Sequence, residues 1–162
     1  MNLDQLSEEL NQCMNYEYES AYYYLAACDY CRAIDLEGFA NFFVKQAEEE
    51  YYDAQKLFDF IDKYGGRVKV KETNGLKANI ASLEEAFQVA FDYEHKLTEE
   101  AYNLFSKVEG ENKESIIDFL KEFADHQVEE EHLIEDILAR VESLNKDDEK
   151  LHKLDQELLQ IH

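Results

Sequence analysis

The sequence predicts an all-α protein with four long helices and a short fifth helix at the C-terminal end. The chain has 162 residues, no proline and only 5 glycines, and these two residue types are the ones that interrupt helices. Apolar residues also recur in alternating steps of four and three along four long stretches, which places them on one face of each helix. We therefore expect a four-helix bundle, formed as one domain over residues 1–162.

The charge of the chain indicates which partners it can bind. Its 38 acidic and 16 basic residues give a net charge of -22. Phosphates of nucleic acids and of anionic membranes would be repelled, whereas cations would be attracted. The sequence has no apolar run of 18 residues and no basic segment leading into a short apolar one, so we expect neither a membrane span nor a secretory signal. A cytoplasmic location follows.

The first two helices are expected to cover about residues 4–34 and 36–64, with Gly65 and Gly66 ending the second. The inward stripe of the first is Leu6, Leu10, Cys13, Glu17, Ser20, Tyr24, Ala27, Cys31 and Ile34. That of the second is Leu36, Ala40, Phe43, Ala47, Glu50, Ala54, Leu57, Ile61 and Tyr64. Cys13, Cys28 and Cys31 all fall on the first helix, which favours reduced, small core residues over disulfides.

The connection at residues 67–81 shows no helical period. It contains a short extended piece at residues 67–70 and a turn signal at Asn74-Gly75. At about 3.3 Å per residue it reaches roughly 50 Å, whereas a helix of about 28 residues is roughly 42 Å long. We therefore expect a crossover that makes the second and third helices parallel.

The last three helices have recognisable starts. Ser82 and Glu85 form a capping box for the third, whose stripe is Leu83, Phe87, Ala90, Glu94, Leu97, Ala101, Leu104 and Val108. Gly110 and a turn near residues 111–112 make the fourth helix antiparallel to it, with the stripe Ile116, Leu120, Phe123, Gln127, Glu130, Ile134, Ile137 and Val141. Asp147 or Asp148 caps the fifth, which must dock through Leu151, Leu154, Leu158 and Ile161 because so short a helix is marginal alone.

Polar side chains interrupt each inward stripe near its middle. These residues are Glu17, Glu50, Glu94, Gln127 and Glu130. A buried polar group without a partner costs roughly 2–7 kcal/mol, and no lysine or arginine lies on the stripes to compensate the acids. Asp53 follows Glu50 by three residues and shares its face. An oxygen-rich set of this kind favours iron(II), manganese or magnesium. One alternative is that the helices are rotated from this assignment. Another is a non-enzymatic acidic helical binding module whose mid-core acids hold no metal.

The whole chain resembles the bacterial-type non-haem ferritins. The resemblance rests on Glu17, the run Glu48-Glu49-Glu50, Glu94 and the run Gln127-Val128-Glu129-Glu130, together with the long crossover and the short fifth helix. It implies a hollow homo-oligomer of 24 subunits in which each subunit binds two iron ions at a ferroxidase centre. Iron(II) is oxidised there by O2 or H2O2 and stored inside as an iron(III) mineral. The centre would use Glu17, Glu50, Glu94, Gln127 and Glu130, and Tyr24 would orient Glu94 or donate an electron.

Two positions depart from the family pattern. Asp53 stands where the family has a histidine, which removes an imidazole ligand. At the outer third-iron site Glu49, Glu129 and Glu130 match, but His126 replaces a glutamate. His126 is either a compensating ligand or a surface histidine. We expect iron binding with changed affinity and oxidation kinetics, and the alternative is a cage subunit with an impaired centre.

Two related families fit less well. His132 lies about 200° around the helix from Glu130, so it does not reach the core as the paired-motif histidine of bacterioferritins would. Tyr51 and Tyr52 occupy the region where bacterioferritins carry a haem-ligating methionine, so no haem is expected. The four-cysteine iron domain of rubrerythrins has no counterpart in the sequence.

Overall fold

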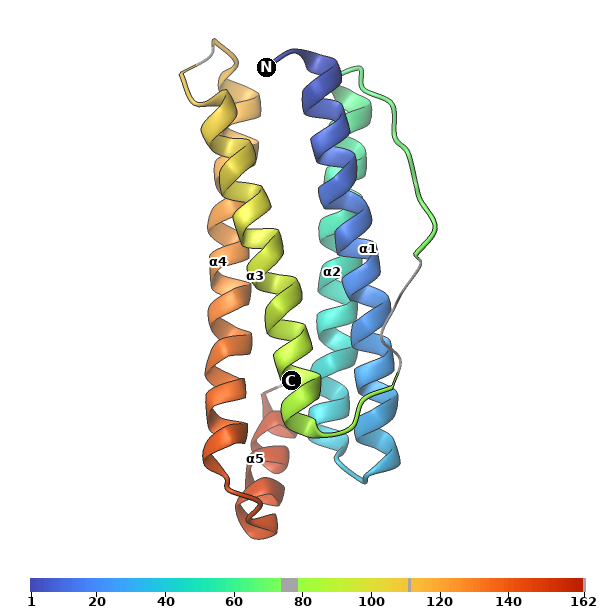
Figure 1. Cartoon of the computed structure of the whole chain (residues 1–162), viewed down its shortest axis with the longest axis vertical. Helices are drawn as coiled ribbons and strands as arrows, with labels where there is room; N and C mark the ends of the chain where they lie inside the picture. Colours follow the sequence, from blue (N-terminus) through green and yellow to red (C-terminus); the bar gives the residue numbers. More distant parts are fainter. Residues whose placement is uncertain (74–78, 111, 162) are drawn as a thin grey trace.

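The computed structural model describes residues 1–73, 79–110 and 112–161. It contains α1 (Leu3–Ala33), α2 (Glu37–Lys63), α3 (Leu83–Val108), α4 (Glu114–Ser143) and α5 (Asp148–Gln160). Within these ranges no residue belongs to a strand. The first four helices lie side by side along the long axis, and α5 lies at one end of the bundle (Figure 1). The all-α fold with a short fifth helix is therefore confirmed.

The order of the helices requires one long connection. Helices α1 and α2 are antiparallel, as are α3 and α4, and residues 67–73 of the segment between α2 and α3 run along the outside of α1 (Figure 1). Helices α2 and α3 are consequently parallel, as the length of this segment predicts. The turn predicted at Asn74-Gly75 lies outside the described residues, and so does Glu111 of the turn between α3 and α4.

Helix ends follow the local signals in the sequence. The side chain of Ser82 accepts a hydrogen bond from the amide of Glu85 at 3.1 Å. The side chain of Asp147 caps α5 by accepting from two first-turn amides. Gly65 and Gly110 have φ angles of 79° and 88°, the left-handed region in which glycine has no steric penalty.

The core has two apolar halves with a polar section between them. One half contains Leu6, Leu10, Leu57, Leu104 and Leu120 among its members. The other is rich in aromatic rings and contains Tyr23, Phe39, Phe43, Phe87 and Ile134 among its members. The predicted stripes are mostly buried. Ile34 and Ile161, at helix ends, are exposed, and Tyr64, Glu130 and Leu151 are partly buried. All three cysteines are buried.

Two asparagines of α1 hold the crossover against the bundle. Asn11 donates to the carbonyl of Arg67 at 2.8 Å and accepts from the amide of Lys69 at 2.7 Å. One turn later, Asn15 donates to the carbonyl of Lys69 and accepts from the amide of Lys71, both at 2.7 Å. Each side-chain amide therefore pairs with the extended backbone as a neighbouring strand would. The extended piece predicted at residues 67–70 is stabilised by helix side chains.

Asn11→Ala is expected to lower the free energy of unfolding by about 1–3 kcal/mol. The native Asn11 side chain is 0% exposed, and its removal leaves the carbonyl of Arg67 and the amide of Lys69 without these partners. The loss should appear as a lower thermal midpoint and as faster hydrogen exchange at Lys69. Asn11→Asp keeps the acceptor for Lys69 and loses the donor to the carbonyls of Ser7 and Arg67, so hydrogen exchange at Lys69 should stay slower in it than in Asn11→Ala. Equal exchange at Lys69 in Asn11→Ala and the native protein would contradict this account.

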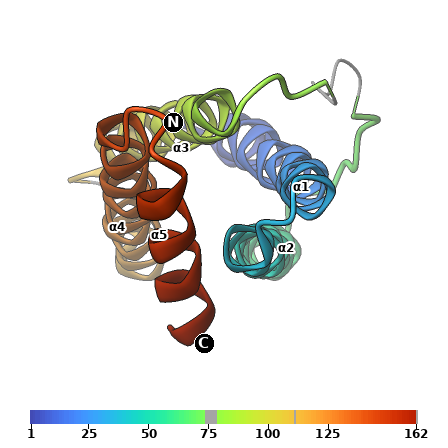
Figure 2. The same cartoon turned by 90° about the horizontal axis from the view of Figure 1, so that it is seen from below.

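Helix α5 docks on the first turn of α2. Figure 2 shows α5 crossing the end of the bundle from α4 toward α2. Asp155, which is 3% exposed, accepts a hydrogen bond from the amide of Phe39 at 2.9 Å. The residue at the start of α2, Leu36, has no side-chain cap of its own. Asp155 thus caps α2 from another helix, and the backbone carbonyl of Asp155 lies where a β-carbon on Gly38 would stand, at 1.8 Å.

Candidate metal centre

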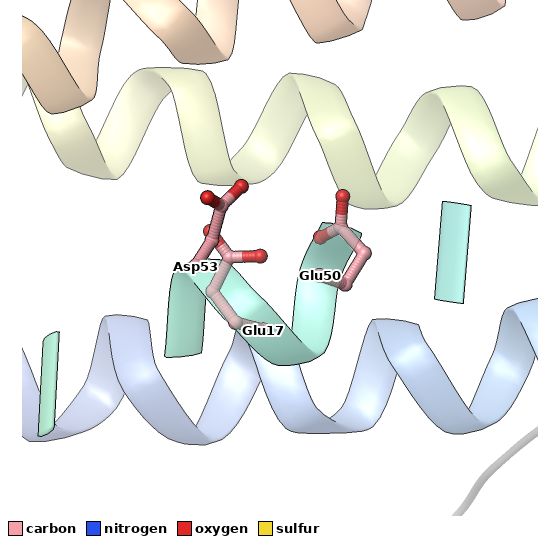
Figure 3. A group of neighbouring side chains, drawn as sticks. All are labelled: Glu17, Glu50 and Asp53. Atoms are coloured by element: carbon pink, nitrogen blue, oxygen red, sulfur yellow. The ribbon is translucent and has the colours of Figure 1, made fainter. Parts of the chain in front are cut away.

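Three carboxylates meet in the polar section of the core. They are Glu17 of α1 and Glu50 and Asp53 of α2, and one oxygen of each lies within 4.8 Å of the others. Figure 3 shows these carboxyl groups gathered between α1 and α3. Their exposed fractions are 0%, 0% and 3%. Glu50 and Asp53 share a face because they are three residues apart on one helix, and the inward stripe of α1 brings Glu17 to the same level.

Helix α3 supplies a fourth buried carboxylate, Glu94, which is 1% exposed. The hydroxyl of Tyr24 donates to one oxygen of Glu94 at 2.7 Å. The side-chain amide of Gln127 on α4 donates to the other oxygen. The hydroxyl of Thr98 donates to the backbone carbonyl of Glu94 at 2.8 Å. The contacts from α1 and α4 fix the orientation of the Glu94 carboxylate.

Several buried oxygens of the cluster have no hydrogen-bond partner. They are both carboxylate oxygens of Glu17 and one oxygen each of Glu50, Gln127 and Glu130. The other Glu50 oxygen accepts from the hydroxyl of Ser20 at 2.8 Å. A buried acceptor left unpaired costs about 1–3 kcal/mol, and more if it is charged. Unpaired carboxylate and amide oxygens of this kind fit hard divalent cations, which would satisfy the oxygens that they contact.

Burial shifts the proton affinity of the cluster. It raises the pKa of Glu17, Glu50 and Glu94 well above the ordinary glutamate value, because a charged carboxylate loses its hydration there. Burial also raises the pKa of Glu130 to about 7, and the nearby negative charge of Asp53 adds to this shift. The metal-free carboxyls therefore take up protons, and a bound cation would displace them.

The metal-free protein is expected to lose stability as the pH rises. Between the ordinary glutamate pKa of 4.5 and the Glu130 value of about 7, the folded form binds protons that the unfolded chain has released. The free energy of unfolding therefore falls with rising pH across this window. Manganese(II) should reverse the trend, because metal binding strengthens as protons leave.

Thermal unfolding at pH 5 and pH 7, with and without manganese(II), tests this expectation. The triple variant Glu17→Gln, Glu50→Gln, Glu94→Gln is the control, since it retains the surface charge and removes the buried acids. Its pH dependence should be shallower than that of the native protein. A native protein that becomes more stable from pH 5 to pH 7 without metal would disprove the assignment.

His126 brings an imidazole to the edge of the cluster. Its Nε2 lies 3.2 Å from Oδ2 of Asp53 and 3.7 Å from Oε1 of Glu130. The hydrogen bond with Asp53 raises the pKa of His126 to about 9. Asp53 and His126, the two positions that depart from the pattern given above, therefore contact each other. His126 of α4 places an imidazole nitrogen beside Asp53 of α2, the position at which the pattern has a histidine.

The remaining residues predicted at an outer site lie beside the cluster. Glu49 and Glu129 are exposed, and their negative charges help to raise the pKa of Glu130. His132 is also exposed. The structure thus brings Glu17, Glu50 and Asp53 together in the core and leaves Glu49 and Glu129 near the solvent.

Sequence reasoning did not single out two residues that support the centre. The hydroxyl of Ser20 on α1 donates a hydrogen bond to the carboxylate of Glu50 on α2. The hydroxyl of Thr98 donates to the backbone carbonyl of Glu94, which lies one turn earlier in α3. A signal for both was present, because each is a small hydroxyl residue three or four positions after a buried acid and on the same helix face. Such neighbours orient ligand side chains.

A helical bundle that projects carboxylates from facing helices into its core has the architecture of the ferritin-like carboxylate proteins, which bind metal ions between their helices. The profile of the ferritin-like domain family matches residues 7–144. The chain therefore belongs to the ferritin family.

Named relatives place the chain near the bacterial non-haem ferritins. It is 34% identical to the bacterial non-heme ferritin of Staphylococcus aureus (strain USA300) over 153 residues, covering 94% of this chain and 92% of the relative. The same figures hold for the protein of this name in Staphylococcus haemolyticus (strain JCSC1435). An open pore ferritin from the hyperthermophilic archaeon Archaeoglobus fulgidus superposes with a TM-score of 0.89 at 33% identity, covering 95% and 94% of the two chains.

Across the described residues, no helix combines the length and the apolar character that crossing a bilayer demands.

Proposed function

We propose that this protein stores iron and oxidises iron(II) at a two-metal centre in the bundle core. The observation that carries the proposal is the set of buried oxygens without partners on Glu17, Glu50, Gln127 and Glu130. Three helices, α1, α2 and α4, supply these oxygens, and α3 adds the buried carboxylate of Glu94. No buried lysine or arginine of the described residues lies among them. Membership of the ferritin family supports iron as the cation.

The ligands divide into two overlapping groups. Glu17, Glu50 and Asp53 would hold one iron(II), since their oxygens lie within 4.8 Å of one another. Glu50, Glu94 and Glu130 would hold the second, with Gln127 fixing the Glu94 carboxylate. Glu50 belongs to both groups because its carboxyl lies close enough to Glu17 and Glu94 for the negative charge of Glu17 to raise the pKa of Glu50 and that of Glu50 to raise the pKa of Glu94, in addition to the effect of burial. Two ions held in this way can share one molecule of O2 or H2O2 as oxidant.

Tyr24 has a defined part in this centre. Its hydroxyl donates to Glu94, and burial raises its pKa well above the ordinary tyrosine value, so the phenol stays protonated and acts as a donor. We assign it first to orienting Glu94 and second to supplying an electron during oxidation. Glu49, Glu129, Glu130 and His126 would hold a third iron ion at the outer edge.

The proposal extends to the assembly. We propose a homo-oligomer, a cage of 24 copies that holds the iron(III) mineral in its interior, in the cytoplasm. The proposed partners are iron(II), O2 or H2O2, and further copies of the chain. Haem, nucleic acid and membranes are not proposed as partners.

One experiment tests the proposal. Iron(II) is titrated anaerobically into the purified protein, the bound iron is counted, oxygen is admitted, and iron(III) absorbance is followed together with particle size. Two or three ions per chain, rapid oxidation and a cage-sized particle are expected. Slow oxidation in a cage of the same size would support the impaired centre that Asp53 suggests. A small particle that binds no iron would support a non-enzymatic helical bundle.

Exchanging Asp53 and His126 tests whether they serve one ion. Asp53→His or His126→Glu alone should change iron affinity and the stopped-flow oxidation trace by about 10-fold, because each alters the balance of nitrogen and oxygen at the site. The double variant Asp53→His, His126→Glu restores one imidazole and one carboxylate, so it should lie closer to the native protein than either single variant does. Strictly additive effects would show that the two side chains act independently.

A further inference from the structure

Four tyrosine rings form a continuous row from the metal centre to the surface of the bundle. This tyrosine row consists of Tyr24, Tyr23 and Tyr16 of α1 and Tyr93 of α3. The ring centroid of Tyr23 lies 6.0 Å from that of Tyr24 and 5.4 Å from that of Tyr93. The centroids of Tyr93 and Tyr16 are 5.2 Å apart. Each step is therefore a contact between aromatic rings.

The inner end of the tyrosine row contacts a proposed iron ligand. Tyr24 is 0% exposed, and its hydroxyl donates a hydrogen bond to Glu94 at 2.7 Å. A phenol that loses an electron also gives up its proton, and the Glu94 carboxylate is already in place to accept it. Tyr24 is thus the ring from which the metal centre can draw an electron.

The second ring cannot hold the oxidation for long. Tyr23 is also 0% exposed, and its hydroxyl donates to the backbone carbonyl of Ala86 at 2.7 Å. A carbonyl accepts a hydrogen bond but does not take the proton. An oxidised Tyr23 would therefore keep its proton and a positive charge within the apolar part of the core. Oxidation is more stable on the next ring outward.

The outer end of the tyrosine row reaches the solvent. Tyr93 and Tyr16 are only partly buried, and Tyr16 lines a surface depression with Asn15 and Glu19 among its neighbours. The ammonium group of Lys96 lies 4.5 Å from the centroid of the Tyr16 ring. This cation disfavours a second positive charge on the ring, so an oxidised Tyr16 releases its proton to the solvent and becomes a neutral radical.

The rings on the opposite side of Tyr24 lack this property. Tyr24 stacks on Phe43 with centroids 5.9 Å apart, and Phe43 contacts Phe87 at 4.7 Å. A phenylalanine ring has no hydroxyl, so it cannot lose a proton and settle as a neutral radical. Oxidation of Tyr24 can therefore spread along the tyrosine row and not into the phenylalanine rings.

We propose that the tyrosine row carries an oxidising equivalent from the metal centre to Tyr16 when the centre holds one iron(II) and meets H2O2. The proposal rests on the proposed function, since the oxidation begins at that centre. Cleaving the O–O bond takes two electrons, of which iron(II) supplies one and the tyrosine row the other.

The net reaction consumes H2O2, one iron(II), one proton and the hydroxyl hydrogen of Tyr16. It yields iron(III), two water molecules and a neutral radical on Tyr16. A small reductant such as ascorbate then returns a hydrogen atom to Tyr16 at the surface. The buried ligands of the centre are thereby protected from one-electron oxidation.

A spin trap locates the radical. The full-length protein receives one iron(II) per chain anaerobically and then H2O2 with a water-soluble nitroso trap, and mass spectrometry identifies the labelled tyrosine. Electron paramagnetic resonance of samples frozen without the trap detects the tyrosyl radical directly. The native protein should show the radical and carry the trap on Tyr16. Tyr102 is 45% exposed and outside the row, so a hydroxyl radical diffusing in solution would label Tyr102 as well.

Two variants interrupt the tyrosine row. Tyr23→Phe and Tyr93→Phe keep each ring and remove its hydroxyl, so both should lose the trap adduct on Tyr16 and leave a radical that ascorbate reduces more slowly. With two iron(II) per chain both should oxidise iron at the native rate, because the iron ions then supply both electrons. Tyr93→Phe, on a partly buried ring, decides the question if Tyr23→Phe does not fold.

Tyr102→Phe is the matched control, and its trapping and radical signal should equal those of the native protein. A trap adduct on Tyr16 that survives in both Tyr23→Phe and Tyr93→Phe would overturn the tyrosine row, as would labelling of Tyr102 to the same extent. Oxidation of iron(II) by H2O2 without a tyrosyl radical would also overturn it. A native protein that binds no iron(II) would instead overturn the proposed function.

Discussion

Glu50→Gln is expected to weaken metal binding at the centre by about 100-fold or more while stabilising the metal-free protein. Losing a residue that only supports a ligand costs about 10- to 100-fold in affinity, and Glu50 is proposed to contact both ions. In the metal-free state, however, Glu50 is a fully buried carboxyl whose pKa burial raises well above its ordinary value. The neutral amide has the same shape and no charge to desolvate, and it can still accept from Ser20.

Opposite changes in two quantities make this result hard to explain by misfolding. Metal affinity is measured by titration with manganese(II) or anaerobic iron(II), and stability by thermal unfolding at pH 8 in a chelator. Glu48→Gln is the matched control, because Glu48 is two positions away on the same helix and exposed. It should change neither quantity appreciably. A Glu50→Gln protein that is less stable without metal, or that retains native affinity, would contradict the proposed centre.

Gly38→Ala is expected to destabilise the docking of α5 by about 1–3 kcal/mol or more, the usual range for overpacking a core. An alanine methyl would stand 1.8 Å from the backbone carbonyl of Asp155, and a backbone atom cannot rotate away. Helix α5 would have to move, which would also remove the cap that Asp155 gives to Phe39. This loss outweighs the roughly 1 kcal/mol that alanine normally gains over glycine inside a helix.

Thermal unfolding and limited proteolysis of α5 measure the effect. Glu37→Ala serves as the control, since Glu37 precedes Gly38 and is exposed. This substitution should change the free energy of unfolding by only about a few tenths of a kcal/mol. Asp155→Ala should reproduce part of the loss by removing the cap alone. A Gly38→Ala protein as stable as the native one, with α5 equally protected, would show that α5 does not depend on this close approach.

The bundle could be predicted because its signals are local. The stripes, the cap at Ser82 and the glycines at helix ends each depend on residues within a few positions of one another. Placing Glu17, Glu50 and Glu94 at one level required only that each acid lie near the middle of its stripe. The cap at Asp147, by contrast, was one of two options, because either of two adjacent aspartates satisfies the pattern.

Contacts between distant parts of the chain could not be predicted in the same way. Nothing near Asp155 in the sequence indicates that it caps a helix starting more than a hundred residues earlier. The contact between Asp53 and His126 depends on how α2 and α4 face each other, and stripe patterns do not give this rotation accurately enough. Both features became visible only when the helices were placed in space.

The asparagine contacts of α1 have a consequence for how this chain can vary. Four residues of an α-helix advance about 6.0 Å, and two residues of extended chain advance roughly 6.6 Å, so Asn11 and Asn15 meet every second residue of the segment that follows Gly66. Inserting or deleting one residue between Gly66 and Lys69 would turn each amide and carbonyl away from its asparagine. Homologous sequences that keep both asparagines should therefore show constant loop length here and tolerate insertions only after Lys71.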